Sequence, residues 1–448
     1  MRRAVELAPQ SPQTWNNLSN VLRESGALDD AIAAYQQSLS LAPPHIPTLN
    51  NLATALHESG RLFEAIDRLR EAIAIDPAHA AVHSNLLYLL HFDPRLDAAA
   101  IRREHEIWNR RHARSPRSTE RFANARSPDR LLRIGYVSSH FGAHVIGRFI
   151  APLLRNHDAS QFQVTCYSPG EQLFERIRND RVDILVDLDM HLAGGSPLLF
   201  ARKPAPIQVT YLGYCAGAGL EAIDYRLSDP YLDPIEWDAN YIEKTVRLPA
   251  TYWCYEPPVE IEIAPLKHDG ITFGCLNNFA KALPSALPAW GEILRRVPNS
   301  RLILAAPSPS TERLAIGILA VDPARVTFVR FQAIADYLRL YNAIDVALDP
   351  FPYAGGTTTC DALYMGVPIV TLAGQTSVGR GGVSILSNLG LPELIAQTPD
   401  QYIEIAARVP RVPNLRDRMK ASPLMDADRF TRDVESAYRQ MWRDWCAS

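Results

Sequence analysis

A repeat of 34 residues near the start of the chain constrains the fold more than any other feature. Three segments recur at this interval with a shared Asn-Leu pattern, Asn16-Asn17-Leu18, Asn50-Asn51-Leu52 and Ser84-Asn85-Leu86. Two glycines and three prolines keep the same interval, Gly26 and Gly60, and Pro9, Pro43 and Pro77. A unit of this length cannot bury its apolar face alone, so neighbouring units must stack on one another. The repeat therefore predicts an extended array at the start of the chain.

The interval is that of tetratricopeptide repeats, which have two antiparallel helices per unit, a Gly in the inner turn and a Pro after the second helix. The sequence begins within the second helix of a unit, so the array lacks its usual start. The third unit departs from the pattern because Pro94 stands at the glycine position. A helix from about Asp97 to Ala113 is expected to end the array. We predict an α-solenoid with its capping helix over residues 1–113.

Residues 114–130 are rich in Arg, Ser and Pro, which is typical of a linker. Beyond them, short apolar strands alternate with helices in two series, 131–265 and 266–448, the second ending in a helix over 429–446. This alternation predicts two parallel sheets, with a ligand in the crevice at the carboxyl ends of the strands. The predicted fold is thus an α-solenoid followed by two Rossmann-like α/β lobes that face each other, the glycosyltransferase B architecture.

The stretch Phe351 to Pro368, FPYAGGTTTCDALYMGVP, has the pattern of a strand end, a glycine turn and the start of a helix. Gly355 and Gly356 allow a positive φ and a close backbone approach. Three threonines, 357–359, stand where hydroxyls cap helices. A helix N-terminus of this kind can hold a diphosphate. An ordinary helix cap explains the same residues.

Composition excludes several classes of function. The net charge of −3 gives no reason to expect nucleic acid or an anionic membrane as a partner. The N-terminus lacks the apolar core of a signal peptide, and no apolar run approaches a membrane span. The six cysteines form no CxxC pair, which favours reduced thiols. We expect a cytoplasmic protein of two or three domains.

Several longer motifs carry a family resemblance. RIGYVSSHFGAH, FARKPAPIQVTYLGY, LNNFAK, FPYAGGTTTCDALYMGVPIVTLAGQTSVGR and LSNLGLPELIA follow the repeats in this order. The combination resembles the SPINDLY and O-linked N-acetylglucosamine transferase family over nearly the whole chain. The resemblance implies an inverting transferase, without a metal or other cofactor, that moves a sugar from a nucleotide diphosphate sugar to Ser or Thr hydroxyls of proteins. It places the acceptor protein along the repeats and beside the first lobe, and the nucleotide sugar on the second lobe.

The resemblance also implies site residues. Lys281, in LNNFAK, matches the phosphate-binding lysine, and a departing diphosphate needs such positive charge. His144, in GAH, matches the active-site histidine of the facing lobe, and it could accept the proton of the acceptor hydroxyl or orient it. The other implied positions are contacts to phosphates, ribose, sugar or base, namely Asn278, Gly355, Gly356, Thr357, Thr358, Thr359, Asp361, Gly213 and Tyr337. His191 matches a position that lines the cleft.

The sequence departs from the family pattern where the donor is recognised. Gly356 stands where N-acetylglucosamine transferases carry the His of GHTT, and Ile334 and Tyr337 replace the lysine and histidine that hold the uracil. Tyr337 could still stack on a base. UDP-N-acetylglucosamine is our main hypothesis for the donor, and GDP-fucose is the alternative because FPYAGGTTTC resembles the plant SPINDLY branch. Residues 168–182 hold one short helix where the family has a helix, a strand and a helix, so a scaffold with a degenerate transferase domain is the third alternative.

Two further sets of charged residues have competing interpretations. Arg380, in GQTSVGR, could reach a phosphate or the acceptor, and it could equally cap a helix or form a salt bridge. Asp183, Asp187 and Asp189 suggest a metal site at first sight. Their spacing on a strand and turn, with apolar residues between them, favours strand-end carboxylates instead.

Overall fold

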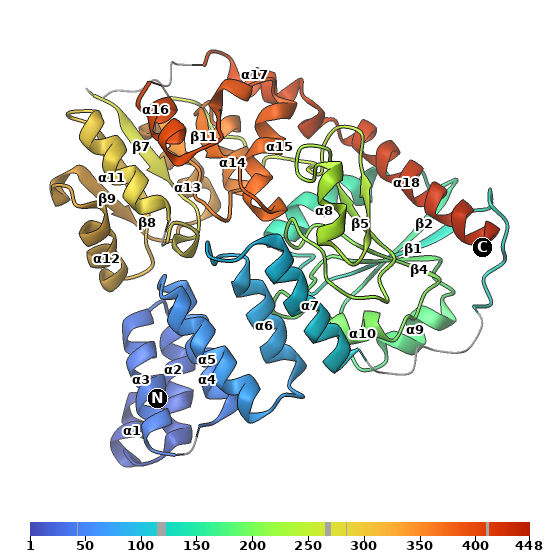
Figure 1. Cartoon of the computed structure of the whole chain (residues 1–448), viewed down its shortest axis with the longest axis horizontal. Coiled ribbons are helices and arrows are strands. Elements are labelled where there is room, and N and C mark those ends of the chain that lie inside the picture. Colours follow the sequence, from blue (N-terminus) through green and yellow to red (C-terminus); the bar gives the residue numbers. More distant parts are fainter. Residues whose placement is uncertain (43, 114–121, 265–269, 284, 409–411) are drawn as a thin grey trace.

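The computed structural model describes residues 1–42, 44–113, 122–264, 270–283, 285–408 and 412–448. It has three parts: a helical array at the N-terminus and two α/β lobes beside it (Figure 1). Pro43, the 114–121 part of the predicted linker, the predicted lobe boundary at 265–266 and Pro284 lie outside the described residues. Among the residues described, no helix is long and apolar enough to span a membrane.

The array consists of paired antiparallel helices, as the repeat predicts. Its helices are α1 (Arg2–Leu7), α2 (Pro12–Glu24), α3 (Leu28–Ser40), α4 (Ile46–Glu58), α5 (Leu62–Ile75), α6 (Ala80–Leu90) and the capping helix α7 (Ala98–His112). Gly26 and Gly60 have φ angles of 77° and 80°, which other residues adopt only with strain. The repeated glycine therefore makes the tight turn between the two helices of each unit.

The repeated asparagines connect one unit to the next. Thr48 Oγ1 donates to Asn16 Oδ1 at 3.0 Å, and Asn85 Nδ2 donates to Asn50 Oδ1 at 2.7 Å. These bonds satisfy polar side chains between helices that otherwise pack alanine and leucine. The Asn-Leu repeat thus combines an apolar seam with a fixed register.

The first lobe is a parallel sheet of six strands in the order β2-β1-β3-β4-β5-β6. Its elements are β1 (Leu132–Val137), α8 (Val145–Asn156), β2 (Phe162–Tyr167), α9 (Leu173–Asn179), β3 (Ile184–Asp187), α10 (Pro197–Ala201), β4 (Ile207–Thr210), β5 (Tyr225–Ser228) and β6 (Lys244–Arg247). All residues of β3 and β4 are buried, as expected for parallel strands covered on both faces. One short helix, α9, joins β2 to β3, as the sequence indicated.

The second lobe is also a parallel sheet, in the order β12-β11-β10-β7-β8-β9. Its strands are β7 (Thr272–Cys275), β8 (Arg301–Ala305), β9 (Val326–Val329), β10 (Val346–Leu348), β11 (Ile369–Leu372) and β12 (Ile395–Ala396). Its helices are α11 (Ala286–Arg296), α12 (Pro309–Leu319), α13 (Ile334–Leu340), α14 (Thr357–Tyr364), α15 (Gly381–Asn388), α16 (Pro399–Arg408) and α17 (Leu415–Lys420). The strand order reverses between β10 and β7, and ligands bind at such a switch point.

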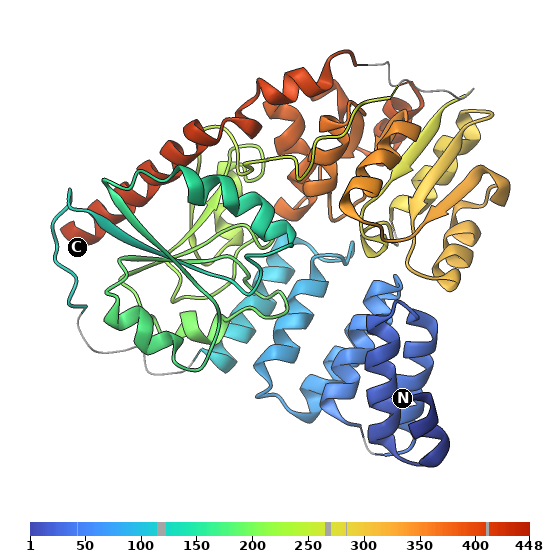
Figure 2. The same ribbon diagram turned by 180° about the vertical axis from the view of Figure 1, so that it is seen from behind.

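The last helix, α18 (Ala427–Ala447), runs from the second lobe back across the first, as Figures 1 and 2 show from opposite sides. Its Glu435 accepts a hydrogen bond from His157 at 2.9 Å, and Trp442 Nε1 donates to Ser127 O at 2.9 Å. The helix that the sequence grouped with the second lobe therefore packs against α8 and β4 of the first. It therefore links the two lobes.

The array touches both lobes. On the second lobe, Asp29 of α3 accepts from Ser308 Oγ at 3.1 Å, and Gly60 lies against Leu283. On the first lobe, the His191 ring packs 5.1 Å from the Trp108 ring of α7. The repeats are thus docked on the pair of lobes.

Three buried histidines at the junction with the first lobe predict an acid-sensitive contact. Burial lowers the pKa of His105 to about 4, that of His191 to about 3, and that of His91 well below its ordinary value. The unfolded chain therefore binds protons below pH 6.5 that the folded chain does not, and stability present above pH 6.5 is lost as the pH falls. At pH 5 each such histidine costs about 2 kcal/mol. The melting temperature should fall steeply below pH 6.5.

A pair of variants tests this origin of the acid sensitivity. Both ring nitrogens of His91 lack a partner in the described part of the chain, so His91→Phe should flatten the pH dependence. His45→Gln, at an exposed site on the array, should leave it unchanged. Equal slopes for His91→Phe and the wild type would contradict the assignment.

Candidate active site

A buried carboxylate shapes the glycine turn after β10. Asp349 follows β10, is fully buried, and accepts from Gly355 N at 2.7 Å and from Thr371 Oγ1 at 2.7 Å. Thr359 Oγ1 lies 3.5 Å from the same carboxylate. Burial raises the pKa of Asp349 to about 6. Thr359 therefore belongs to the support of the turn, whereas the sequence placed it among the ligand contacts.

Both glycines of the turn are required by close packing. A Cβ on Gly355 would stand 2.8 Å from Asp349 Oδ1, and a Cβ on Gly356 would stand 2.6 Å from the Trp253 ring. The φ of Gly356 is −130°, and Gly355 is not among the residues with positive φ. Neither glycine uses the positive φ that a missing side chain allows, and the close packing is what requires glycine at both positions. Trp253 occupies the space beside Gly356 that a side chain would need.

The N-terminus of α14 is open to a ligand. Gly356 precedes Thr357 as the N-cap, and no side chain caps the helix. Thr358 Oγ1 instead donates to Asn277 Oδ1 at 2.6 Å. The threonine hydroxyls therefore do not form the ordinary helix cap that was the alternative interpretation of this stretch. The first amides of the helix remain available to bind an anion.

Lys281 reaches the same turn from the end of β7. It closes the short 3₁₀ helix Phe279–Lys281, its Nζ donates to Ala354 O at 3.0 Å, and it lies 4.1 Å from the centre of the Tyr353 ring. Burial lowers the pKa of the Lys281 ammonium to about 8, against the attraction of Asp349. Adjacent strands β10 and β7 thus bring the lysine together with residues 355–359, which we call the Gly-Thr turn.

Two neighbouring asparagines divide their roles differently from the prediction. Asn278 is exposed, and its side chain accepts from Ala280 N at 3.0 Å as the cap of the 3₁₀ helix. Asn277 is 6% exposed and holds Thr358. The sequence offered one signal for Asn277, which is the first polar residue of LNN after a buried strand.

His144 stands at the N-terminus of α8 in the first lobe. Its Nδ1 accepts from Ile146 N at 3.3 Å, and its ring lies 4.3 Å from that of His140. Burial, and then His140, lower the pKa of His144. The ring is therefore neutral at pH 7, and because Nδ1 accepts, the proton is on Nε2. In this tautomer His144 is a hydrogen-bond donor.

The loop before His144 is fixed by Asp189, which follows β3. Its carboxylate accepts from Ser138 Oγ at 2.6 Å and lies 3.1 Å from His140 Nδ1. A Cβ on Gly213 would stand 3.1 Å from Asp189 O, so the predicted glycine lets the chain after β4 pass this turn. Asp187 accepts a hydrogen bond from Met190 N after the strand, and Asp183 forms an ion pair with Arg130 before it. These carboxylates are strand-end anchors, as their spacing indicated.

Asp361 lies one turn into α14 and is 1% exposed. It accepts from Arg148 Nη2 at 2.8 Å, Tyr255 OH at 2.7 Å and Tyr337 OH at 3.1 Å. The Tyr337 hydroxyl also lies 3.0 Å from that of Tyr341. In the structure the predicted ribose and base contacts therefore bind each other.

His191 and Arg380 lie apart from this group. His191 is bonded to Ser84 Oγ at 2.9 Å and to Ala218 O at 2.7 Å, at the junction with the repeats. Arg380 Nε donates to Tyr231 O at 2.9 Å, and its guanidinium lies 5.3 Å from the centre of the Trp237 ring. Both have structural partners that fully explain their positions.

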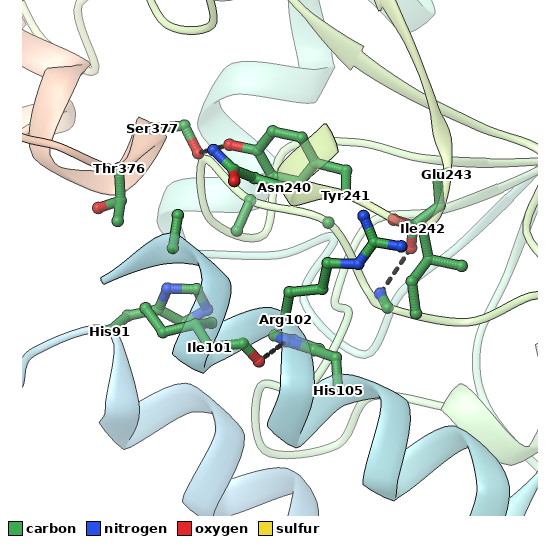
Figure 3. Close-up of a pocket in the computed structure, with 14 residues that line it drawn as sticks. His91, Ile101, Arg102, His105, Asn240, Tyr241, Ile242, Glu243, Thr376 and Ser377 are labelled. Carbon is green, nitrogen blue, oxygen red and sulfur yellow. Dashed lines mark hydrogen bonds between the residues drawn. The ribbon is translucent and has the colours of Figure 1, made fainter. Parts of the chain in front are cut away.

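A cavity lies between the repeats, the first lobe and residues 376–377 (Figure 3). Its volume of about 30 Å³ is enough for one water molecule. His91, His105 and Glu243 line it, each with a buried polar atom that lacks a partner among the described residues. None of the predicted site residues lines it, so it is separate from the candidate active site.

The protein has two Rossmann-like lobes. One carries a lysine and an open helix N-terminus at its switch point, and the other carries a histidine at the matching edge. This is the architecture of the B-type class of glycosyltransferases. The chain belongs to glycosyl transferase family 41, whose model matches residues 169–256 and 262–433. A tetratricopeptide repeat model matches residues 10–78.

Several known proteins are similar to the chain. A Solanum lycopersicum protein named probable UDP-N-acetylglucosamine–peptide N-acetylglucosaminyltransferase SPINDLY is 36% identical over 390 residues, which cover 76% of this chain and 42% of that protein. The chain spans about two fifths of the length of the curated relatives it matches. A structure of a Thermobaculum terrenum O-GlcNAc transferase mutant is 33% identical, with a TM-score of 0.94 over 99% of this chain and 93% of that one.

These similarities confirm the predicted family, the predicted fold and the class of glycosyltransferase. They do not bear on individual residues. The roles of Lys281, His144, Asp361 and the Gly-Thr turn stay predictions that rest on the geometry above.

Proposed function

We propose that the chain is an inverting, metal-independent protein O-glycosyltransferase that moves N-acetylglucosamine from UDP-N-acetylglucosamine to Ser or Thr hydroxyls. The observation that carries the proposal is the Lys281 ammonium, held 3.0 Å from Ala354 O beside the open N-terminus of α14. Positive charge and free amides converge where a diphosphate would leave. The name of the Solanum lycopersicum relative supports the donor and the acceptor class.

In this reaction the acceptor hydroxyl oxygen forms a bond to the anomeric carbon while the bond from that carbon to the diphosphate oxygen breaks, and the hydroxyl proton passes to the departing diphosphate or to water. Lys281 and the amides of α14 stabilise the negative charge that develops on the diphosphate. This is the electrostatic task that a metal ion performs in other transferases. With its proton on Nε2, His144 would donate a hydrogen bond that orients the acceptor or the sugar.

GDP-fucose is the second candidate donor. The surroundings of Gly356 and Tyr337 are the observations in its favour. Trp253 fills the space beside Gly356, and Tyr337 is bonded to Asp361. Neither position then offers the contact that the family resemblance implies for the uridine sugar. A scaffold with a degenerate site ranks third, because the first sheet retains six strands and the phosphate-side residues are assembled.

A nucleotide panel separates these candidates. UDP or GDP should raise the melting temperature of the folded protein if it binds. Nucleotide release from each sugar donor, with a lysate as the acceptor source, should then identify the donor. Binding of UDP with release from UDP-N-acetylglucosamine supports the main proposal, GDP with GDP-fucose supports the second, and binding without any release supports the scaffold.

The pKa of Lys281 predicts an alkaline limit to activity. The ammonium is charged below a pKa of about 8 and neutral above it, so kcat/KM should fall as the pH rises through this value. Lys281→Arg keeps its charge at all these pH values. The alkaline limb in a kcat/KM profile should therefore disappear in Lys281→Arg, whatever the variant's absolute rate. A limb that persists unchanged would assign it to another group.

A further inference from the structure

The two lobes are joined through an ion pair close to the candidate active site. Arg148 of α8 donates from Nη2 to Asp361 Oδ1 of α14 at 2.8 Å, across 213 residues of sequence. The Arg148 side chain is 20% exposed and that of Asp361 is 1% exposed. Because the pair is largely buried, removing either partner would leave an unpaired charge at a high cost in free energy.

Each partner lies one helical turn beyond a candidate site residue. Arg148 N donates to His144 O at 3.0 Å, the first turn of α8. Asp361 follows Thr357, the first residue of α14, by four positions. Four residues of helix rise about 6 Å. The ion pair therefore joins the two helices just behind the ends that carry His144 and the Gly-Thr turn.

Tyrosines extend the ion pair back to the Gly-Thr turn. Tyr255 OH donates to Asp361 at 2.7 Å, and Tyr337 OH donates to its other oxygen at 3.1 Å. The Tyr337 hydroxyl lies 3.0 Å from that of Tyr341, and the Tyr341 hydroxyl lies 3.1 Å from Thr358 O, so the two hydroxyl protons are shared among three contacts, to Asp361, between the tyrosines and to Thr358 O. The network thus ends on the backbone of the threonine that Asn277 holds from the other side.

We propose that Arg148 is a positioning residue, which by pairing with Asp361 fixes the N-terminus of α8, and with it His144, relative to the N-terminus of α14. The proposal rests on the proposed function for its catalytic consequence. In this proposal Arg148 controls how the two lobes are placed relative to each other, and the affinity for the nucleotide depends on the second lobe alone.

Three variants test the proposal. Arg148→Met removes the charge and keeps most of the length, and Arg148→Lys restores the charge without the planar fork. Arg155→Met is the matched control, because Arg155 lies on the same helix in an exposed pair with Glu256. Arg148→Met should lower kcat about 10- to 100-fold, since misplacement by about 1 Å has effects of this size. The Kd of UDP should change less than about threefold, Arg148→Lys should recover most of kcat, and Arg155→Met should match the wild type.

Hydrogen exchange provides a readout that needs no turnover. Peptides spanning 144–150 and 357–364 should exchange faster in Arg148→Met and return toward the wild type in Arg148→Lys. If Arg148→Met does not fold, the double variant Arg148→Met with Asp361→Asn removes the unpaired buried charge, and the same peptides are compared.

The outcomes separate this inference from the proposed function. A wild type that binds neither UDP nor GDP and releases no nucleotide contradicts the proposed function, and the exchange result then decides the inference alone. Unchanged kcat with unchanged exchange in Arg148→Met overturns the inference. So does a change confined to UDP affinity, in either direction, or a lysine variant no better than methionine.

Discussion

Replacing Lys281 with alanine is expected to lower kcat/KM about 10²- to 10³-fold, the usual cost of removing one donor that stabilises a developing oxyanion. The lysine is the side chain that brings a full positive charge to the Gly-Thr turn from the neighbouring strand β7. Its ammonium is partly withdrawn from water, which strengthens its interaction with a diphosphate relative to an exposed lysine. The loss should appear in kcat as well as in KM, because the charge it meets grows as the sugar departs.

The control is Lys244→Ala, which removes an exposed lysine of β6 with a cation–π contact to Tyr225. It should leave both kinetic constants within about twofold, as expected of surface substitutions. The melting temperature of Lys281→Ala should stay near that of the wild type, since Ala354 O loses one donor and the Tyr353 ring remains packed. A Lys281→Ala enzyme with full activity would remove the observation on which the proposed function rests.

The repeat and the alternation of strands predicted the fold because they are local patterns with a direct physical cause. A 34-residue interval needs stacked neighbours, and the repeated Gly26 and Gly60 need a left-handed turn. Strands that end in LNNFAK and in FPYAGG were expected at one edge of a sheet, and β7 and β10 are adjacent there. The position of α18 was not predictable in this way. Its amphipathic pattern required a partner without specifying which lobe supplied it.

The residues whose roles could not be predicted from the sequence act through contacts with residues of other elements. Asp349 lies outside the quoted motifs, and nothing in LNNFAK separates Asn277 from Asn278. The roles of Asp349 and Asn277 follow from bonds to Gly355 and Thr358 that only the folded sheet creates. Arg148 likewise meets Asp361 only when the lobes come together. His191 shows the reverse error, because a family match placed it in the cleft whereas its two ring bonds place it at the repeats. Spacing predicts neighbours along an element, and it says little about pairs between lobes.

Asp349 is expected to be as important to the site as Lys281, although no ligand touches it in the proposed reaction. Asp349→Ala leaves the buried Gly355 N–H and the Thr371 hydroxyl without their acceptor. Each unsatisfied group costs about 1 to 3 kcal/mol, so with two such groups the variant should lose about 2 to 6 kcal/mol of stability by chemical denaturation. The turn that presents the α14 amides should also relax, and UDP should no longer raise the melting temperature.

Asp349→Asn separates the shape of this carboxylate from its charge. Its amide can still accept from Gly355 N, so the fold and the turn should be kept. Burial raises the folded pKa of Asp349 from 3.8 to about 6, which means that the folded state favours the protonated form. Wild-type stability should therefore fall relative to the Asn variant as the pH rises from 3.8 to about 6. Because Asp349 raises the pKa of Lys281, the alkaline limb of kcat/KM should move to lower pH in Asp349→Asn. An Asn variant with the same stability difference at pH 4 and pH 7, and with an unmoved alkaline limb, would show that the carboxylate acts neither as a buried charge nor on Lys281.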